Sequence, residues 1–250
     1  RDGRPLALLP LGVVTRRAGT VAHWLGGSHG NFNFGVVERS APALLTAPVL
    51  RALLIAAGRK AGVDAFLLTQ MPYRWAGLDN PMARLGGIPS VERGYLGRLG
   101  PDAEALLKER LSTNARRKLG RQERRLADQG EIRFFRARTA AEVERLLDGY
   151  LSDKAGWFQR RGIADPFGRP GIRDFLVAAA QAGLSSDRPG IELYGYEVDG
   201  KLLAVLGGAS EGRRFCSMFT GRTEGERARH SPGEELAVAV VADLCARGFE

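Results

Sequence analysis

The chain has 250 residues, 44% of them hydrophobic, which is enough for one large core or for two domains of roughly 100 to 150 residues each. Lysine and arginine number 37 against 28 aspartate and glutamate, and the formal net charge of +9 favours anionic or phosphorylated partners. No stretch reaches the roughly 18 apolar residues that span a bilayer, and no signal peptide opens the chain. From these features we expect a cytoplasmic protein without a transmembrane segment in this sequence, with peripheral membrane association left open.

Cysteine and histidine offer little chemistry in this sequence. Cys216 and Cys245 lie in apolar segments and are expected to be buried thiols. His23, His29 and His230 show no ligand spacing for zinc, so we expect no metal site. The chain begins without methionine and stops as a new strand starts, so we expect a fragment of a longer protein.

The first hundred residues alternate apolar stretches with glycine-rich loops. The stretch "DGRPLALLPL" from Asp2 is typical of a hairpin strand, and "TAPVLRALLIAAGRKAG" from Thr46 indicates an apolar helix. Between them, the loop "LGGSHGNFNF" carries His29, Asn31 and Asn33. Polar side chains in such a loop can bind a sugar, although asparagine and glycine also serve turns.

A densely basic segment follows, from Arg98 to Gly130. Leucines at helical spacing predict helices, and basic residues cluster between Asn114 and Arg125. The segment is either a solvated helix face or a contact for phosphate or an anionic surface, because arginine forms bidentate bonds to phosphate oxygens. It lacks a helix-turn-helix context and interleaved aromatic residues, so nucleic acid is not the expected partner.

From Glu131 onward the order of elements is the clearest. Apolar spacing predicts a strand, two amphipathic helices, a three-stranded meander and a final helix. The segments are "EIRFFRA", "TAAEVERLLDGYLSDKAGWFQRRG", "GIRDFLVAAAQAG", "IELYGYEV", "KLLAVLGGAS", "RFCSMFTG" and "SPGEELAVAVVADLCARGFE". Asp199-Gly200 is a strong two-residue hairpin signal, and Gly248 is a left-handed helix stop. This order predicts an α+β fold, with helices on both faces of a mostly antiparallel sheet.

The two ends of the chain resemble each other at a long offset. "DGRPLALLPL" matches "DGKLLAVLGG", "HWLGGSHG" resembles "MFTGRTEG", and the helix after Thr46 has the layout of the helix after Ser231. Internal similarity of this kind predicts two copies of one unit. We therefore expect a first half over residues 1–100, basic connecting helices over 101–130 and a second half over 131–250.

The start of the last helix, "SPGEEL", combines an expected cap with one unexplained residue. Ser231 as N-cap, Pro232 at the first helical position and Glu234 form a predicted capping box. Gly233 is left over, although glycine costs up to about 1 kcal/mol in a helix relative to alanine. Without a side chain it lets a ligand approach the backbone N–H groups, where the helix dipole favours negative charge. The preceding loop adds Arg222, Arg227, Arg229 and His230. The segment is therefore either an anion site, which we favour, or a capped structural helix with a tolerated glycine.

This order of elements resembles the GNAT acyltransferase superfamily, in which the start of that last helix holds the pyrophosphate of acyl-CoA. The segments "STNARRKLGRQERRLADQGEI", "DKAGWFQRRGIADPF", "FTGRTEGERARHSPGEEL" and "LGGSHGNFNF" are similar to CelD-type acetyltransferases linked to bacterial cellulose and exopolysaccharide synthesis. The glycine-rich signature of ordinary GNAT members is absent. The CelD type is similar in layout to Fem-type aminoacyl transferases, which also pair two GNAT-like halves. The resemblance implies an α+β chain of two tandem GNAT-like halves, the second binding acyl-CoA and the acceptor lying between them.

The resemblance also implies a reaction: transfer of an acyl group, acetyl above all, from acyl-CoA to an amine or hydroxyl of a sugar, polysaccharide precursor or small molecule, without a metal. The implied cofactor contacts are Met218, Phe219, Thr220, Arg229, Ser231 and Gly233. The implied acceptor contacts are His29, Asn31, Asn33, Lys154 and Trp157. Candidates for the general base, by position only, are Glu192, Tyr194 and Glu235. For Tyr194, Lys154 and Trp157, packing is the competing interpretation.

Two other functions stay open. A Fem-type transferase would take its group from aminoacyl-tRNA and would use the basic helix between Asn114 and Arg125 to contact RNA. A scaffold or glycan-binding module in exopolysaccharide assembly would have no activity. No indispensable base can be named from the sequence, which keeps this last alternative in consideration.

Overall fold

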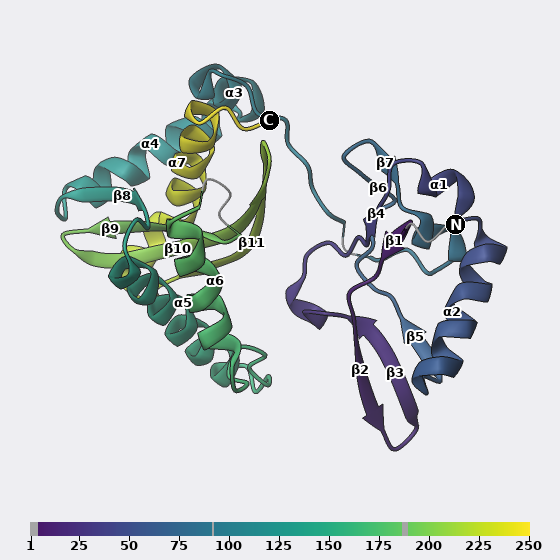
Figure 1. Ribbon diagram of the computed structural model, residues 1–250. Coiled ribbons are helices and arrows are strands. Elements are labelled where there is room, and N and C mark those ends of the chain that lie inside the picture. The colour runs from purple at the N-terminus through teal and green to yellow at the C-terminus, as the bar shows by residue number, and fades with distance from the viewer. Residues whose placement is uncertain (1–4, 92, 187–189) are drawn as a thin grey trace. The chain divides into compact units, whose positions relative to one another are not determined.

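The computed structural model describes residues 5–91, 93–186 and 190–250. The chain divides into two compact units, Arg1–Leu96 and Gly97–Glu250 (Figure 1). The helices of the basic segment belong to the second unit. Both Cys216 and Cys245 also lie there, Cys245 buried and Cys216 half-buried.

The second unit is built on a four-stranded antiparallel sheet in the order β11-β10-β9-β8. Its elements are α3 (Ala103–Arg110), α4 (Thr113–Ala127), β8 (Ile132–Arg136), α5 (Ala140–Arg160), α6 (Ile172–Leu184), β9 (Glu192–Val198), β10 (Lys201–Glu211), β11 (Arg214–Arg222), the 3-10 helix η3 (Glu226–His230) and α7 (Pro232–Ala246). The strands and helices predicted after Glu131 are therefore confirmed.

Helices cover both faces of this sheet (Figure 1). On one face α5 and α6 pack over a core that includes Leu146 and Tyr150, and it takes Leu193 from β9. On the other face α4 and α7 enclose a second core, which takes Tyr194 and Tyr196 from the same strand. Successive side chains of a strand point to opposite faces, so β9 supplies both cores and all seven of its residues are buried. The predicted α+β architecture is confirmed.

Two local features of the sheet follow from the sequence. Asp199 and Gly200 both have positive φ, 54° and 72°, and join β9 to β10 as the Asp-Gly signal predicts. In β11 the register skips one residue, because Gly207 pairs with Phe219 and Gly208 pairs with Ser217. Met218 is thus the extra residue of a β-bulge.

The first unit holds shorter elements. They are β1 (Ala7–Leu8), β2 (Leu11–Arg16), β3 (Gly19–Trp24), η1 (Gly27–His29), β4 (Val36–Val37), α1 (Ala41–Leu44), α2 (Ala47–Ala61), β5 (Ala65–Leu67), β6 (Arg74–Trp75), β7 (Leu78–Asp79) and η2 (Pro81–Leu85). The sheet β2-β3-β5 consists of an antiparallel hairpin and a parallel third strand. Its order of hairpin and helix, β2, β3 and α2, repeats the order of β10, β11 and α7.

The hairpin strand of the first unit was predicted too early in the chain. The hairpin is formed by β2 and β3, whereas residues 7–8 pair with residues 36–37. Pro5 and Pro10 flank this short pairing, and proline cannot donate to a strand ladder. Asp2, with which the predicted strand begins, lies outside the described residues.

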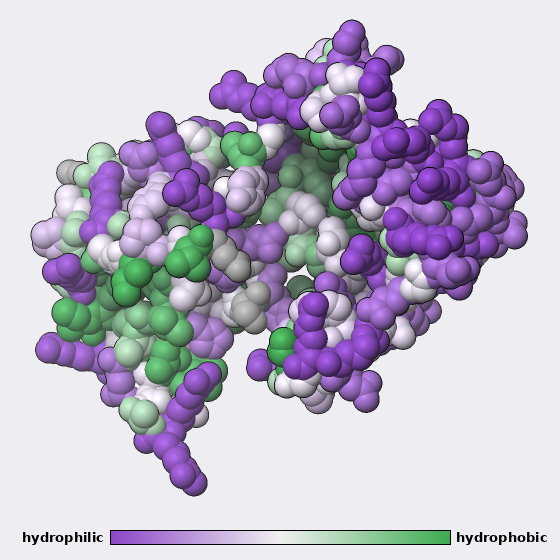
Figure 2. Space-filling model, turned by 180° about the vertical axis from the view of Figure 1, so that it is seen from behind, coloured by the Kyte–Doolittle hydropathy of each residue, from purple (hydrophilic) through white to green (hydrophobic). Residues whose placement is uncertain are grey.

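The two units differ in what they expose. The first unit presents large apolar side chains such as Leu53, Ile55 and Leu67, each more than half exposed. Figure 2 shows hydrophobic residues gathered on a face of this unit and mainly hydrophilic residues over the second. In the described part of the chain, no helix is both long and apolar enough to cross a membrane.

Two glycine-to-alanine changes test the packing of the second unit. A Cβ on Gly195 would lie 2.6 Å from the ring of Phe135 and 2.7 Å from Leu146. We expect Gly195→Ala to lower the free energy of unfolding by about 1 to 3 kcal/mol through overpacking. Gly120 in α4 has open space around its Cβ position, so Gly120→Ala should raise it by up to about 1 kcal/mol. Urea unfolding measures both; equal effects would contradict this packing.

Candidate active site

The chain turns into α7 through a residue in the left-handed conformation. Ser231 has φ 51° and ψ 48° and makes no side-chain cap to the helix. Its carbonyl oxygen instead accepts hydrogen bonds from the N–H groups of Glu234 and Glu235, at 2.9 and 3.3 Å, while its Oγ accepts from Nε2 of Gln122 at 3.1 Å. The predicted capping box is therefore wrong. The positive φ directs the hydroxyl to α4, and Glu234 pairs with Lys118 on that helix at 3.3 Å.

Gly233 leaves an open approach to the helix start. Pro232 has no N–H, and the N–H groups of Glu234 and Glu235 are already bonded to Ser231. The N–H of Gly233 meets no acceptor among the described residues, and no atom lies within 4 Å of the position a Cβ would take. Packing therefore does not require glycine here. A free donor at the positive end of a 15-residue helix is suited to an anion.

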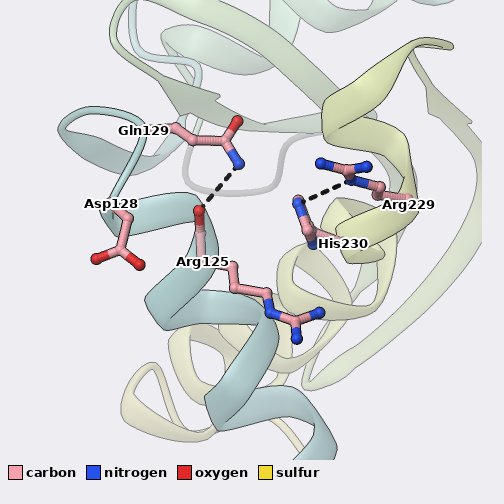
Figure 3. A pocket seen from close by; sticks show the side chains of 5 residues that line it. All are labelled: Arg125, Asp128, Gln129, Arg229 and His230. Atoms are coloured by element: carbon pink, nitrogen blue, oxygen red, sulfur yellow. Dashed lines mark hydrogen bonds between the residues drawn. The ribbon is translucent and has the colours of Figure 1, made fainter.

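A cavity of about 580 Å³ opens between the end of α4 and η3, the 3-10 helix that precedes α7. Its lining combines two guanidinium groups with an imidazole, an amide and one carboxylate; the residues are Arg125, Asp128, Gln129, Arg229 and His230 (Figure 3). Gln129 donates to the backbone oxygen of Arg125 at 3.0 Å. Nε of Arg229 donates to Nε2 of buried His230 at 3.4 Å.

Two of the five residues that line this cavity were predicted from the sequence as part of an anion site. Arg229 and His230 were expected in the loop before α7, whereas Arg125, Asp128 and Gln129 were not connected with it. The signal available was the basic spacing of α4, but only the tertiary packing of α4 beside η3 brings these residues together. Arg227, also expected at the anion site, instead donates to the backbone oxygens of Val198 and Gln129.

The predicted thioester-binding residues lie at the bulge of β11. Met218 is the bulged residue, and Thr220 returns to the ladder opposite Leu206. The ring of Phe219 lies over Gly207, where a Cβ would collide with it. Its centroid is 4.6 Å from that of Tyr150 on α5. Phe219 therefore belongs to the α5 face of the sheet.

Lys154 and Trp157 lie one and two turns after Tyr150 on α5. Nζ of Lys154 is 5.7 Å from the centroid of the Tyr150 ring and 5.8 Å from that of Trp157. Burial lowers the pKa of Lys154, and the charge of Asp153 opposes this. The guanidinium of Arg161 lies 4.0 Å over the Trp157 ring. Through Tyr150, these two predicted acceptor residues share a face with Phe219.

Glu192 is held by cations. Its carboxylate accepts from Arg247 at 2.7 Å, from Arg136 at 2.8 Å and from Ser210. Burial acts to raise the pKa of Glu192, but these hydrogen bonds outweigh it and the net shift is downward. Such a carboxylate is a weak proton acceptor at neutral pH. This geometry favours a role in joining β8, β9, β10 and α7.

Tyr194 belongs to the same network. Its hydroxyl donates to Asp243 at 3.0 Å and accepts from Arg247 at 2.7 Å. Burial, followed by the charges of Glu192 and Asp243, raises the pKa of Tyr194. Its catalytic role stays a prediction, and the contacts favour structural use.

Glu235 has a different environment. It is 8% exposed, and its Oε1 has no hydrogen-bond partner in the described part of the chain. Burial raises its pKa to about 7, helped by the charges of Glu123 and Glu234. Among the three residues predicted as bases, it is the one whose pKa lies near neutrality, where general bases work best. Its helix, α7, lies on the α4 side of the sheet, opposite Phe219 and Lys154.

The three predicted sugar contacts of the first unit have distinct surroundings. Asn33 is buried; its N–H donates to Gln70 at 2.9 Å and its Nδ2 donates to Thr69 at 3.0 Å. These bonds tie two loops together and account for the residue structurally. His29 is half-buried at the end of η1, and Asn31 is exposed. The described residues contain no group of three or more His, Cys, Asp or Glu that could hold a metal ion.

Burial of Glu235 predicts a pH-dependent stability. Because the pKa rises from an ordinary 4.5 to about 7 on folding, this group destabilises the fold progressively as pH rises from about 4.5 to about 7. We expect Glu235→Gln to be isostable with wild type at about pH 4 and more stable by about 1 to 3 kcal/mol at pH 8. Chemical denaturation at both pH values measures this.

The matched control for that experiment is Glu226→Gln, which removes an exposed carboxylate of η3. It should leave the pH dependence unchanged. If Glu235→Gln also left it unchanged, the carboxyl of Glu235 would be as well solvated in the folded state as in the unfolded state.

A family of known proteins matches this chain over most of its second unit. Residues 113–250, more than half of the chain, match the family model of the acetyltransferase (GNAT) domain. Comparison with curated protein sequences gave no significant match. The match does not separate the CelD type from other members, so that finer assignment stays a prediction.

Two solved structures are similar to the chain. One is the C-terminal DUF2156 domain of a protein named as a lysylphosphatidylglycerol synthetase from Agrobacterium fabrum, with 15% identity, TM-score 0.50, and coverage of 98% of this chain and 68% of that one. The other is a conserved protein of unknown function from Bacteroides thetaiotaomicron, with 13% identity, TM-score 0.48, and coverage of 95% and 69%. At these identities the first shows a shared fold alone. By its family match, the chain belongs to the GNAT acetyltransferases, enzymes that transfer acyl groups from acyl-CoA.

Proposed function

We propose that this protein moves an acetyl or similar acyl group from acyl-CoA to an amine or hydroxyl of a sugar, polysaccharide precursor or other small molecule. The observation that carries the proposal is the start of α7. There the unpaired N–H of Gly233 follows three residues after His230, which lines a cavity together with Arg125 and Arg229. A phosphate-rich cofactor needs this combination of donors and positive charge.

The cofactor would bind along the end of β11. Its phosphates would meet Gly233 and Arg229, and its thioester would reach the bulge at Met218. A bulge releases backbone groups from the ladder, so the Met218 N–H can donate to the thioester oxygen. Donors positioned for the developing oxyanion are worth about 3 to 4 kcal/mol of barrier.

The transfer itself needs one nucleophile and one proton acceptor. The acceptor nitrogen or oxygen attacks the carbonyl carbon, the carbon–sulfur bond breaks, and the thiolate leaves and is protonated to CoA thiol. The proton of the acceptor passes to a base. Lys154 and Trp157 lie on the face of Phe219 and are our candidates for the acceptor side. Glu235 lies across the sheet, so we place it with the cofactor.

A Fem-type aminoacyl transfer is the second candidate. Arg117, Arg121 and Arg124 of α4 are exposed and have no carboxylate within 4.0 Å in the described part of the chain. Such a row can contact phosphates of RNA. The shared fold with a domain named for lysylphosphatidylglycerol synthesis is compatible with this candidate. Steeply salt-dependent tRNA binding, with no response to CoA, would favour it.

Release of CoA thiol tests the main proposal. We would supply acetyl-CoA and longer acyl-CoA donors with a panel of amino-sugar acceptors and detect thiol with DTNB. Acceptor-dependent thiol release is expected. A scaffold would instead bind glycan or protein without consuming thioester, and that result would overturn the proposal.

Gly233 allows a substitution that separates binding from folding. Because a Cβ meets no atom there, Gly233→Ala should raise the free energy of unfolding by up to about 1 kcal/mol. The same methyl group crowds the phosphate, so acetyl-CoA binding should weaken roughly tenfold, and roughly 100-fold or more for Gly233→Asp. Calorimetric titration measures the affinities.

The control for this pair is Gly120→Ala, which also adds a methyl group to an open helix position but lies away from the cavity lining. It should bind acetyl-CoA as wild type does. Unchanged affinity in Gly233→Asp would place the phosphates elsewhere.

A further inference from the structure

Two buried oxygen atoms without partners lie under the start of α7. One is Oε1 of Gln122 and the other is Oε1 of Glu235, each in a side chain that is at least nine-tenths buried. Both residues contact Ser231. Nε2 of Gln122 donates to the Oγ of Ser231, and the backbone N–H of Glu235 donates to the carbonyl oxygen of Ser231. A buried carboxylate without a donor at one of its oxygens is costly, and protonation lowers that cost because it removes the charge.

The charges around Glu235 also oppose its ionisation. Glu123 faces it from α4 and Glu234 from its own helix, and Tyr196 approaches it from β9. The side chains that β10 adds to this core, Leu203 and Leu206 among them, are apolar.

Neither Lys118 nor Arg229 pairs with Glu235 in the described part of the chain. Lys118 of α4 binds Glu234, and Nε of Arg229 on η3 donates to His230. No ion pair to Glu235 exists among the described residues. Burial raises the pKa of Glu235 to about 7, which is close to neutral pH. The carboxyl is thus poised to gain or lose a proton when a charge arrives nearby.

We propose that Glu235 is a proton-binding site coupled to the anion site at the start of α7, so that the bound cofactor keeps this carboxyl neutral. The inference rests on the proposed cofactor site. Glu235 acts here as a positioning residue, because it acts through the helix start and not on the reacting atoms.

The sign of the effect follows from like-charge repulsion. A phosphate bound at Gly233 adds negative charge near Glu235 and raises its pKa above the value of the free protein. Binding therefore takes up a proton. Affinity is greatest below about pH 7, falls as pH rises from the free pKa to the bound pKa, and then levels off. Each unit of pKa difference corresponds to about a tenfold change in affinity.

Proton uptake is measured by titrating the full chain with acetyl-CoA at pH 7.5 in buffers of different ionisation enthalpy. Wild type is expected to take up part of a proton, and Glu235→Gln is expected to take up less. At pH 8.5 the glutamine variant should bind acetyl-CoA more tightly than wild type, by up to about tenfold. Titration of the ligand phosphates is common to both proteins and cancels in the comparison.

His230→Asn is the matched control, because it removes a buried side chain that lines the cavity itself and leaves Glu235 in place. It should weaken binding and still show the uptake that depends on Glu235. Equal proton uptake and equal pH dependence in wild type and Glu235→Gln would overturn the coupling alone. Absence of acetyl-CoA binding in every variant at every pH would overturn the proposed function and the coupling with it.

Discussion

The left-handed backbone of Ser231 is the constraint on which the cofactor end of the second unit depends. A non-glycine residue in this conformation costs roughly 1 to 2 kcal/mol, and here the cost is offset by bonds that few other conformations allow. The carbonyl of Ser231 closes the first turn of α7, and its hydroxyl receives Gln122 from α4. The N–H of Gly233 is left without an acceptor among the described residues, and α4 is held where Arg125 lines the cavity.

The central sheet separates two kinds of chemistry. On the face of α4 and α7 lie Arg125, Arg229 and His230, which suit a phosphorylated ligand, and the buried carboxyl of Glu235. On the face of α5 lie Phe219, Tyr150 and Lys154, linked by ring contacts. The bulge at Met218 lies in the strand between them. In the proposed binding mode, an acyl-CoA along β11 would place its thioester carbonyl at this bulge. Its phosphates would lie beyond the end of the strand, at the start of α7.

Periodicity was sufficient to predict the second unit, because its strands and helices are long and bury wide apolar faces. The Asp199-Gly200 hairpin needed nothing beyond its own turn chemistry. The capping box failed because Ser-Pro-Gly-Glu is compatible with two backbone conformations, and only the contact with Gln122, 109 residues away in sequence, selects between them. Glu192 illustrates the same limit: the sequence shows a glutamate on a strand, while Arg136 and Arg247 come from distant elements.

Amide hydrogen exchange at the start of α7 tests the central claim most directly. The backbone N–H of Gly233 has no acceptor among the described residues, so its exchange in the free protein should be fast. Saturating acetyl-CoA should slow exchange at Gly233 and in the residues around it, from η3 into the first turn of α7. Binding of acetyl-CoA that slows exchange elsewhere and leaves this turn unprotected would contradict the account.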